Sequence, residues 1–235
     1  MRVSHLAIDG SIVTIEADAD LETSATATGW AIVPSLMRTY PFTVSPAGHS
    51  EIVEENVRAT VPAVEISEIE TFELKGGELR VAEVEIPTAT GGQRPLTVGA
   101  WEGRRGCLST SLVGRRQEEL IAMFDTLQFS ERPEGLAIDS PVTMQPRTPQ
   151  VIKEIPGVAV LDIRPATAIE LERIPRTRGL ATEHGELFRV SETSIALLFV
   201  NDTVVTRVNP LEHAENEQVM AIVGDLSISW IPRER

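Results

Sequence analysis

The sequence of 235 residues contains a single cysteine, Cys107, and only two lysines, Lys75 and Lys153. One cysteine excludes an intrachain disulfide, and its place in an apolar run indicates a buried small side chain. Aromatic residues make up 4% of the chain, so aliphatic side chains must fill its core. Because no apolar run approaches the length of a membrane span, we expect no membrane insertion.

Positive charge is also scarce, because 35 acidic residues outnumber 21 basic ones and give a net charge of −14. Such a surface repels nucleic-acid phosphates and anionic lipids. The basic cluster of note is the run of Arg173, Arg176 and Arg178. Because of this net negative charge, we expect the protein to bind no nucleic acid. The N-terminus has no signal-peptide core, so we expect a cytoplasmic protein.

Familiar catalytic motifs are missing: the sequence has no His-Glu-x-x-His helix, Gly-x-Ser-x-Gly elbow, phosphate loop or dinucleotide fingerprint. We therefore predict no catalytic residue, no metal site and no cofactor. His49, which lies close to Glu51, Glu54 and Glu55, is the best candidate for a metal ligand, and a solvated acidic loop is the alternative. The histidines are scattered singly, at His5, His49, His184 and His213.

The most informative feature that is present is a repeated helix-to-strand pattern. Glu118–Pro133 and Glu217–Pro232 share five identities at a shift of 99 residues. In each copy, apolar residues follow the period of a helix and then alternate as in a strand. This repeat favours an internal duplication, and two unrelated helix–strand units are the alternative. The two apolar stripes are Leu120, Met123, Phe124 and Leu127, and Val219, Ile222, Val223 and Leu226.

Shorter repeats and hairpin signals extend the pattern. The residues Leu-Ala-Ile-Asp at 6–9 recur at 136–139, and Gly-Glu-Leu at 77–79 recurs at 185–187. The Asp9-Gly10 pair between two apolar runs predicts a hairpin. Further strands are expected at residues 63–74, 78–86, 96–101, 107–112, 194–200 and 203–208.

These patterns together predict an α+β fold of two similar units. Each unit is a mainly antiparallel sheet with a late amphipathic helix packed on one face. The first unit spans residues 1–134, and the second, shorter unit spans residues 135–235. A proline-rich linker at about 131–150 is expected to join them.

The sheet hairpin, late helix and final strand of residues Leu96–Ser130 resemble the PsbP-like fold, and Ser194–Ser229 resemble it more faintly. The ending MFDTLQFS is similar to the helix-to-strand close of that family. The fold occurs in photosystem extrinsic subunits, in a nuclear-import factor that binds the GTPase Ran, and in Eag-type secretion chaperones. The resemblance implies an antiparallel sheet flanked by helices and a role in binding other proteins; it implies no catalytic residue.

The aromatic residues Trp30, Tyr40, Trp101 and Trp230 lie by this pattern in loops or at strand ends. Trp and Tyr at such places often anchor protein interfaces, although each ring could instead cap a local core. We therefore expect these four residues to bind a partner, which is another protein or a second copy of the chain. The predicted function is a non-enzymatic adaptor, chaperone or structural subunit of a larger assembly. The alternative is an enzyme whose dispersed site joins His49 or His184 to a carboxylate.

Overall fold

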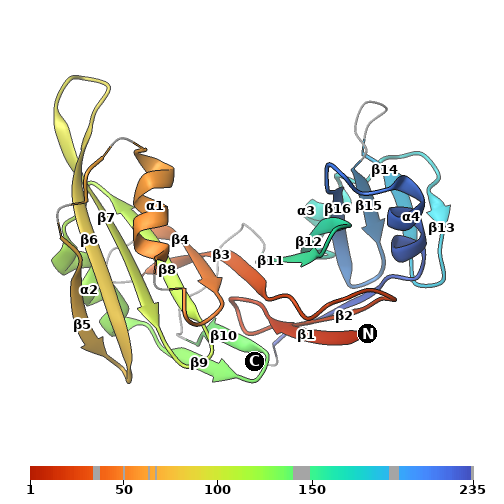
Figure 1. Cartoon of the computed structure of the whole chain (residues 1–235), viewed down its shortest axis with the longest axis horizontal. Helices are drawn as coiled ribbons and strands as arrows, with labels where there is room; N and C mark the ends of the chain where they lie inside the picture. The colour runs from red at the N-terminus through yellow and green to blue at the C-terminus, as the bar shows by residue number, and fades with distance from the viewer. Residues whose placement is uncertain are drawn as a thin grey trace. The chain divides into compact units, whose positions relative to one another are not determined.

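The computed structural model describes residues 1–33, 38–49, 51–62, 64–66, 68–139, 149–190 and 196–233. Over these ranges the chain is α+β, with seventeen strands in mainly antiparallel sheets and four helices (Figure 1). None of the helices in the described parts of the chain is long and apolar enough to cross a membrane.

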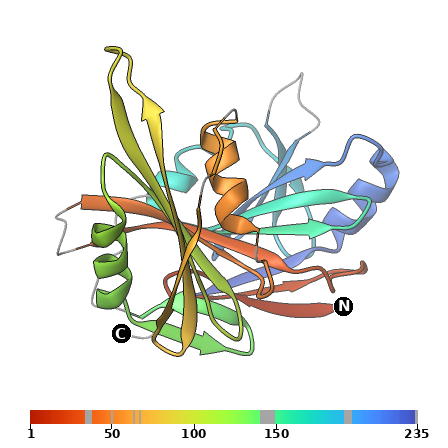
Figure 2. The same cartoon turned by 60° about the vertical axis from the view of Figure 1, so that its left-hand side comes forward.

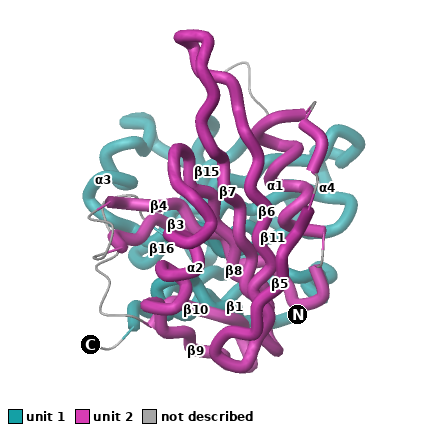
Figure 3. The backbone as a smooth tube through the Cα atoms, turned by 90° about the vertical axis from the view of Figure 1, so that its left-hand side faces the viewer, with its two compact units in different colours: residues 1–28, 148–235 teal, residues 29–147 magenta. Residues whose placement is uncertain are grey.

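The chain forms two compact units (Figure 3). Unit 1 contains residues 1–28 and 148–235, and unit 2 contains residues 29–147. The N-terminal residues belong to unit 1 because their strands form hydrogen bonds with strands near the C-terminus. The predicted boundary at 134/135 refers to repeated units of sequence, whereas these two units are defined by compactness. That boundary therefore stays a prediction.

Unit 2 contains a sheet with the strand order β3-β4-β8-β7-β6-β5 and a separate two-stranded sheet, the hairpin β9–β10. Strand β3 starts in unit 1 and ends in unit 2. The turn between β6 and β7 extends beyond the neighbouring strands (Figure 2). The elements are β3 (Ala25–Val33), β4 (Arg38–Ser45), α1 (Ile52–Thr60), β5 (Glu70–Leu74), β6 (Gly77–Pro87), β7 (Gln93–Glu102), β8 (Cys107–Val113), α2 (Gln117–Thr126), β9 (Phe129–Arg132) and β10 (Gly135–Ile138).

Unit 1 is a sheet with the strand order β13-β14-β15-β16-β12-β11-β3, together with a small sheet in the order β1-β2-β17. The elements that belong wholly to it are β1 (Arg2–Leu6), β2 (Ile12–Glu16), β11 (Gln150–Ile155), β12 (Ala159–Pro165), α3 (Ala168–Leu171), β13 (Leu180–Ala181), β14 (Glu186–Arg189), β15 (Leu197–Val200), β16 (Val204–Pro210), α4 (Asn216–Gly224) and β17 (Ser227–Ile231).

The two repeated helix-to-strand patterns form α2 with β9, and α4 with β17. The expected core positions Phe124 and Val223 are both buried, at 0% and 1% exposure. Helix α2 packs closely on β7 because Gly99 has no side chain. A Cβ atom at Gly99 would lie 2.4 Å from the Leu120 side chain, closer than atoms can pack. The helical periodicity therefore identified both buried stripes correctly.

Two tight turns contain residues with positive φ, and the first forms at the expected Asp9-Gly10 pair. In the β1–β2 turn, Gly10 has a φ of +85°, and the Ser11 N–H donates to Asp9 Oδ1 at 3.0 Å. In the β5–β6 turn, Lys75 has a φ of +53°. Its ammonium donates to the backbone carbonyls of Asp125 and Leu127 at the end of α2. A cation at this end of a helix satisfies carbonyls that the helix itself leaves unpaired.

Helices α1 and α2 lie on opposite sides of the unit 2 sheet (Figure 1). The periodicity did not predict α1, whose apolar residues Ile52, Val53 and Val57 pack on β6 and β7. The strand expected at 63–74 is shorter in the structure, where β5 begins at Glu70. Within the expected range, Ala63 and Ser67 lie outside the described residues. Strand β5 ends the strand order of unit 2.

The thiol of Cys107 lies in the core beneath α1 and is 1% exposed. Burial raises the pKa of Cys107 to about 12, and the nearby Glu102 carboxylate acts in the same direction. The thiolate, which is the reactive form, is therefore almost absent at neutral pH. We expect a chromogenic disulfide reagent to leave Cys107 unmodified at pH 8 in the native protein and to modify it fully in denaturant. Rapid modification of the native protein would contradict this placement.

Candidate functional site

The sheet of unit 1 has a pocket of about 330 Å³ on the side where α3 lies. We call it the arginine pocket. Its charged lining residues come from β12, from α3 with the segment that follows it, and from β16. Its apolar lining comes from the ends of β14 and β15, from β16 and from one proline. The lining consists of Asp162, Arg164, Glu170, Arg173, Pro175, Val190, Leu198, Val205 and Arg207.

Strand register explains why charged residues gather on this face. Asp162 of β12 is paired with Arg207 of β16, and Arg207 is paired with Leu198 of β15. Directly paired residues point to the same side of a sheet, and successive residues of one strand point to opposite sides. The residues on the opposite side of the same strands are the buried Leu161, Ile163, Phe199, Thr206 and Val208.

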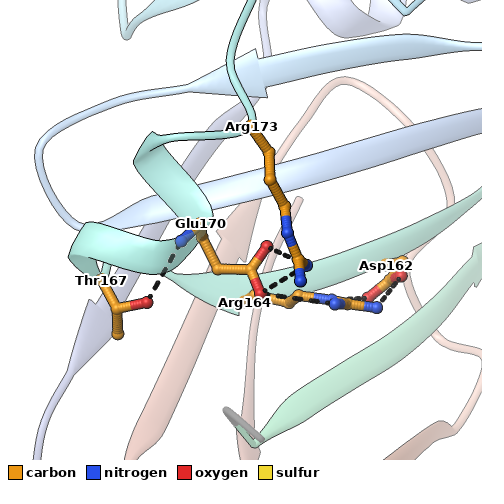
Figure 4. Close-up of polar contacts among 5 residues, drawn as sticks. All are labelled: Asp162, Arg164, Thr167, Glu170 and Arg173. Carbon is orange, nitrogen blue, oxygen red and sulfur yellow. Dashed lines mark hydrogen bonds and ion pairs between the residues drawn. The ribbon is translucent and has the colours of Figure 1, made fainter.

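A single helical turn, α3, brings a carboxylate into the pocket. Thr167 precedes the helix, and its hydroxyl accepts a hydrogen bond from the Glu170 N–H at 3.5 Å. The Glu170 side chain is 7% exposed and points toward the two arginines of the network (Figure 4). The flanking Ile169 and Leu171 are 52% and 43% exposed. The Thr-x-x-Glu pattern is a known helix-start signature, and here it fixes the acid beside the sheet.

The ion pairs form a chain from the strand to the helix (Figure 4). Arg164 donates to both oxygens of Asp162 at 3.0 and 2.9 Å, and to Glu170 Oε1 at 3.5 Å. Arg173 donates to the two oxygens of Glu170 at 3.1 and 3.2 Å. The hydrogen bond with Asp162 is the largest influence that raises the pKa of Arg164 above its ordinary value. Two-point pairing of this kind holds a guanidinium in one orientation.

Among the lining residues that the structure describes, three guanidinium groups face two carboxylates, so positive charge is in excess. Arg164 and Arg173 share those two carboxylates. Arg207 is exposed and forms no ion pair with any residue that the structure describes. The pocket thus presents one guanidinium that is free to bind an anionic group, in a protein with a net charge of −14.

The aromatic residues expected to bind a partner are mostly buried. Trp101 and Trp230 are 2% and 4% exposed, Tyr40 is 8% exposed, and Trp30 is half-buried. Trp101 stacks on Phe129 at 4.3 Å and donates its indole N–H to the Leu74 carbonyl. Three of the four rings therefore lie in the core, as in the alternative given above; the ring of Trp101, for example, is covered by Phe129 from a segment distant in the sequence. A binding role for these residues stays a prediction.

The histidines lie outside the arginine pocket. His49 Nε2 is 2.9 Å from Glu55 Oε2 in an exposed pair. His184 lines a separate pocket of unit 1, also of about 330 Å³, together with Glu16, Asp18 and Asp225. These two sites are the places where the structure brings a histidine near carboxylates, as the enzyme alternative requires.

His5 makes the stability of unit 1 sensitive to acid. Burial lowers the pKa of His5 to about 4, and the charge of Lys153 acts in the same direction. Between pH 6.5 and about pH 4, His5 is protonated in the unfolded chain but neutral in the folded chain. The free energy of unfolding therefore decreases as the pH falls through this window. We expect a loss of about 2 kcal/mol between pH 7 and pH 4. Urea titrations should show that His5→Leu loses less stability than the native protein over this range; equal losses would contradict the assignment.

The sequence indicated Arg173 as part of a basic cluster, but it did not single out Asp162, Arg164, Glu170 or Arg207. Two signals were available for some of these residues. Asp162 and Arg164 alternate with apolar residues in β12, and Thr167 with Glu170 forms the helix-start pattern. Arg207 gave no signal, because its place depends on the register of β16 with β12.

Comparison of the chain with protein-family models, with curated proteins and with solved structures finds no match. The resemblance to the PsbP-like fold therefore stays a prediction.

Proposed function

We propose that the protein is a non-enzymatic binding component, an adaptor or subunit, whose partner protein docks on the arginine pocket of unit 1. The proposal rests on one observation. The face of the unit 2 sheet on which α1 packs is covered by that helix, whereas the face of the unit 1 sheet beside α3 is only partly covered. In unit 2, the nine-residue helix α1 follows β4 and packs its apolar side on the sheet. In unit 1, α3 follows β12 and has only four residues.

The rim of the arginine pocket supplies an apolar surface for such a partner. Ile169 and Leu171 flank Glu170 on α3, and Val190, which lines the pocket, is 39% exposed. Burial of exposed apolar area contributes roughly 25 cal/mol per Å² to association, before the cost of immobilising the partners. Aliphatic side chains around a fixed ion-pair network thus take the anchoring role that was predicted for the four aromatic residues.

We also propose that the chain contains two copies of one ancestral unit. The strand orders support this: β13-β14-β15-β16-β12-β11 in unit 1 corresponds, strand by strand along the sequence, to β5-β6-β7-β8-β4-β3 in unit 2. The helices correspond in the same way, α1 to α3 and α2 to α4. Such an arrangement agrees with the predicted relation to the PsbP-like fold. An experimental structure in which α2 and α4 pack on opposite faces of their hairpins would contradict the duplication.

The enzyme alternative has weaker support. The His49–Glu55 pair is solvent-exposed, and the pocket beside His184 places no hydrogen bond between that histidine and a carboxylate that the structure describes. An exposed ion pair lacks the desolvation that tunes a catalytic histidine or carboxylate. Turnover of a small molecule that disappears in His184→Ala, with native binding of protein partners, would favour the enzyme instead.

Site-specific photocrosslinking tests the proposed docking surface. A benzophenone amino acid is introduced separately at Val190, at Leu171 and, as a control of similar exposure, at Val113 in unit 2. In native extract we expect a discrete adduct from Val190 and Leu171 but not from Val113, reduced by an excess of unlabelled protein. The adduct identified by mass spectrometry is then rebuilt from two purified proteins. Adducts that are absent, or equal at all three positions, would refute docking on this surface.

A further inference from the structure

We infer that the arginine pocket binds a carboxylate group that an apolar segment of the partner protein carries, with Arg207 as its receptor. This inference rests on the proposed function and names the chemistry that the docking surface recognises. The carboxylate is an aspartate or glutamate side chain, or a chain terminus, with aliphatic neighbours.

The charges in the pocket leave Arg207 available to bind a carboxylate. Asp162 and Glu170 are engaged by Arg164 and Arg173, so neither acid is left to neutralise Arg207. Arg207 shares a sheet face with Arg164, since Asp162 and Arg164 are two residues apart on β12 and Asp162 is paired with Arg207. An incoming carboxylate can therefore accept charge-assisted hydrogen bonds from Arg207 while the positive field of Arg164 and Arg173 supports it.

The ion-pair network beside Arg207 is ordered before a ligand arrives. Glu170 is 7% exposed and is fixed at the start of a short helix, and Arg164 is held between two acids. Binding therefore requires only Arg207 to be immobilised, and the surrounding charges need no further ordering. Arg164 also cannot turn away to pair elsewhere without leaving two carboxylates partly desolvated, which is costly.

One side of the pocket is apolar. Val190, Leu198, Val205 and Pro175 line the same cavity as the arginines. This mixture suits a carboxylate whose neighbouring atoms are aliphatic. It suits a phosphate poorly, because a phosphate carries more charge and exposes no apolar surface. The net charge of −14 also disfavours a polyanion, since repulsion from the rest of the surface grows with each added negative charge.

The exposed rim favours a protein rather than a free organic acid as the source of the carboxylate. A small acid would fit within a pocket of about 330 Å³ and would leave Ile169 and Leu171 in water. A polypeptide segment that crosses the pocket can place its acid on Arg207 and its apolar side chains on this rim. The combination of a charged centre and apolar surroundings is typical of residues that dominate binding energy at interfaces.

The test uses the full chain and three probes. The first probe is a short peptide with one glutamate between leucines, acetylated and amidated so that the glutamate carries its only charge. The second replaces that glutamate by glutamine, and the third is sodium butyrate. Binding is measured by calorimetry and by the Nε–Hε resonance of Arg207 in ¹⁵N spectra, assigned with Arg207→Lys. Arg207→Gln is compared with Arg94→Gln, which removes an equal charge from an exposed arginine of unit 2.

We expect the glutamate peptide to shift the Arg207 resonance and to bind at least about tenfold more tightly than the glutamine peptide or butyrate. Arg207→Gln should remove that preference, and Arg94→Gln should retain it. Equal binding of both peptides, an unaffected Arg207→Gln variant, or no binding would overturn the carboxylate inference. Butyrate binding as tight as the peptide would assign the pocket to a free acid instead. Adducts at Val190 that persist in Arg207→Gln would leave the proposed function standing without this inference, whereas the absence of adducts refutes the proposed function itself.

Discussion

Replacing Phe124 by alanine is expected to lower the free energy of unfolding by about 3–5 kcal/mol. The ring of Phe124 is 0% exposed and lies in the apolar stripe of α2 with Leu120 and Met123. Its centroid is 6.4 Å from that of Phe129, which itself stacks on Trp101. The substitution therefore removes a large buried side chain and leaves a cavity beside an aromatic cluster that is too tightly packed to collapse around it.

Urea titrations monitored by tryptophan fluorescence measure this effect, because Trp101 reports on the same cluster. Asp125→Ala provides the control, since Asp125 is the next residue of α2 and its side chain is exposed. We expect the control to change stability by no more than about 0.5 kcal/mol. If Phe124→Ala and Asp125→Ala had equal effects, the buried face of α2 would have been assigned wrongly.

Lys153→Ala is the second substitution with a large expected effect, a loss of about 3–5 kcal/mol. Lys153 lies on β11 and is 0% exposed. Its ammonium donates to the Leu21 carbonyl at 2.8 Å and to both the carbonyl and the hydroxyl of Thr23. Truncation removes a long buried side chain and also leaves buried acceptors of residues 21–23 without their donor.

Lys153→Met separates these two contributions, because methionine retains most of the volume but donates no hydrogen bond. We expect it to cost about 1 kcal/mol, mainly for the carbonyls that lose a partner. Burial lowers the pKa of Lys153, so the unfolded chain holds a proton at alkaline pH that the folded chain has lost. The native protein should therefore gain stability as pH rises from the folded pKa toward 10.5, and Lys153→Met should lack this gain. Chemical denaturation of both variants at pH 7 and pH 10 checks this; an alanine variant no less stable than the methionine variant would refute the packing role.

The parts of the fold that the sequence predicted are those decided by local chemistry. The stripes of α2 and α4 arise from side chains three and four residues apart, and the Asp9-Gly10 turn depends on two adjacent residues. Helix α1 was missed although its apolar residues Ile52, Val53 and Val57 have helical spacing. Glu54, Glu55 and the preceding Glu51 obscured that stripe, because they gave the segment a polar average composition.

The parts that could not be predicted depend on contacts between distant segments. Residues 1–28 join unit 1 because β2 pairs with β17 and β3 pairs with β11, and no pattern within those residues specifies the partner strands. Burial of aromatic rings has the same origin. Trp101 is the last residue but one of β7, close to the expected strand end, but Phe129 reaches it from beyond helix α2 and covers its ring. Position at the end of an element therefore did not determine exposure.

The arginine pocket was not predicted as a site, because its lining comes from three strands, one helix and the segments that follow α3 and β14. Arg207 and Asp162 meet only because the register of β12 with β16 sets them opposite each other. A one-residue shift of that register would turn Arg207 into the core and expose Thr206 and Val208. The sequence thus contained the residues of the pocket but not the pairing that assembles them.

The discontinuity of unit 1 has a consequence for the order in which the protein forms during translation. Residues 1–28 are synthesised before unit 2, and their partner strands β11 and β17 are synthesised after it. Unit 2 is contiguous and can fold while unit 1 is still incomplete, whereas unit 1 cannot be completed before β17 is made. A nascent chain released before β17 would carry the β1–β2 hairpin with an unpaired edge on β2, and such edges are prone to pair with other chains. Products that terminate before β17 are therefore expected to be degraded rather than to accumulate as a stable fragment.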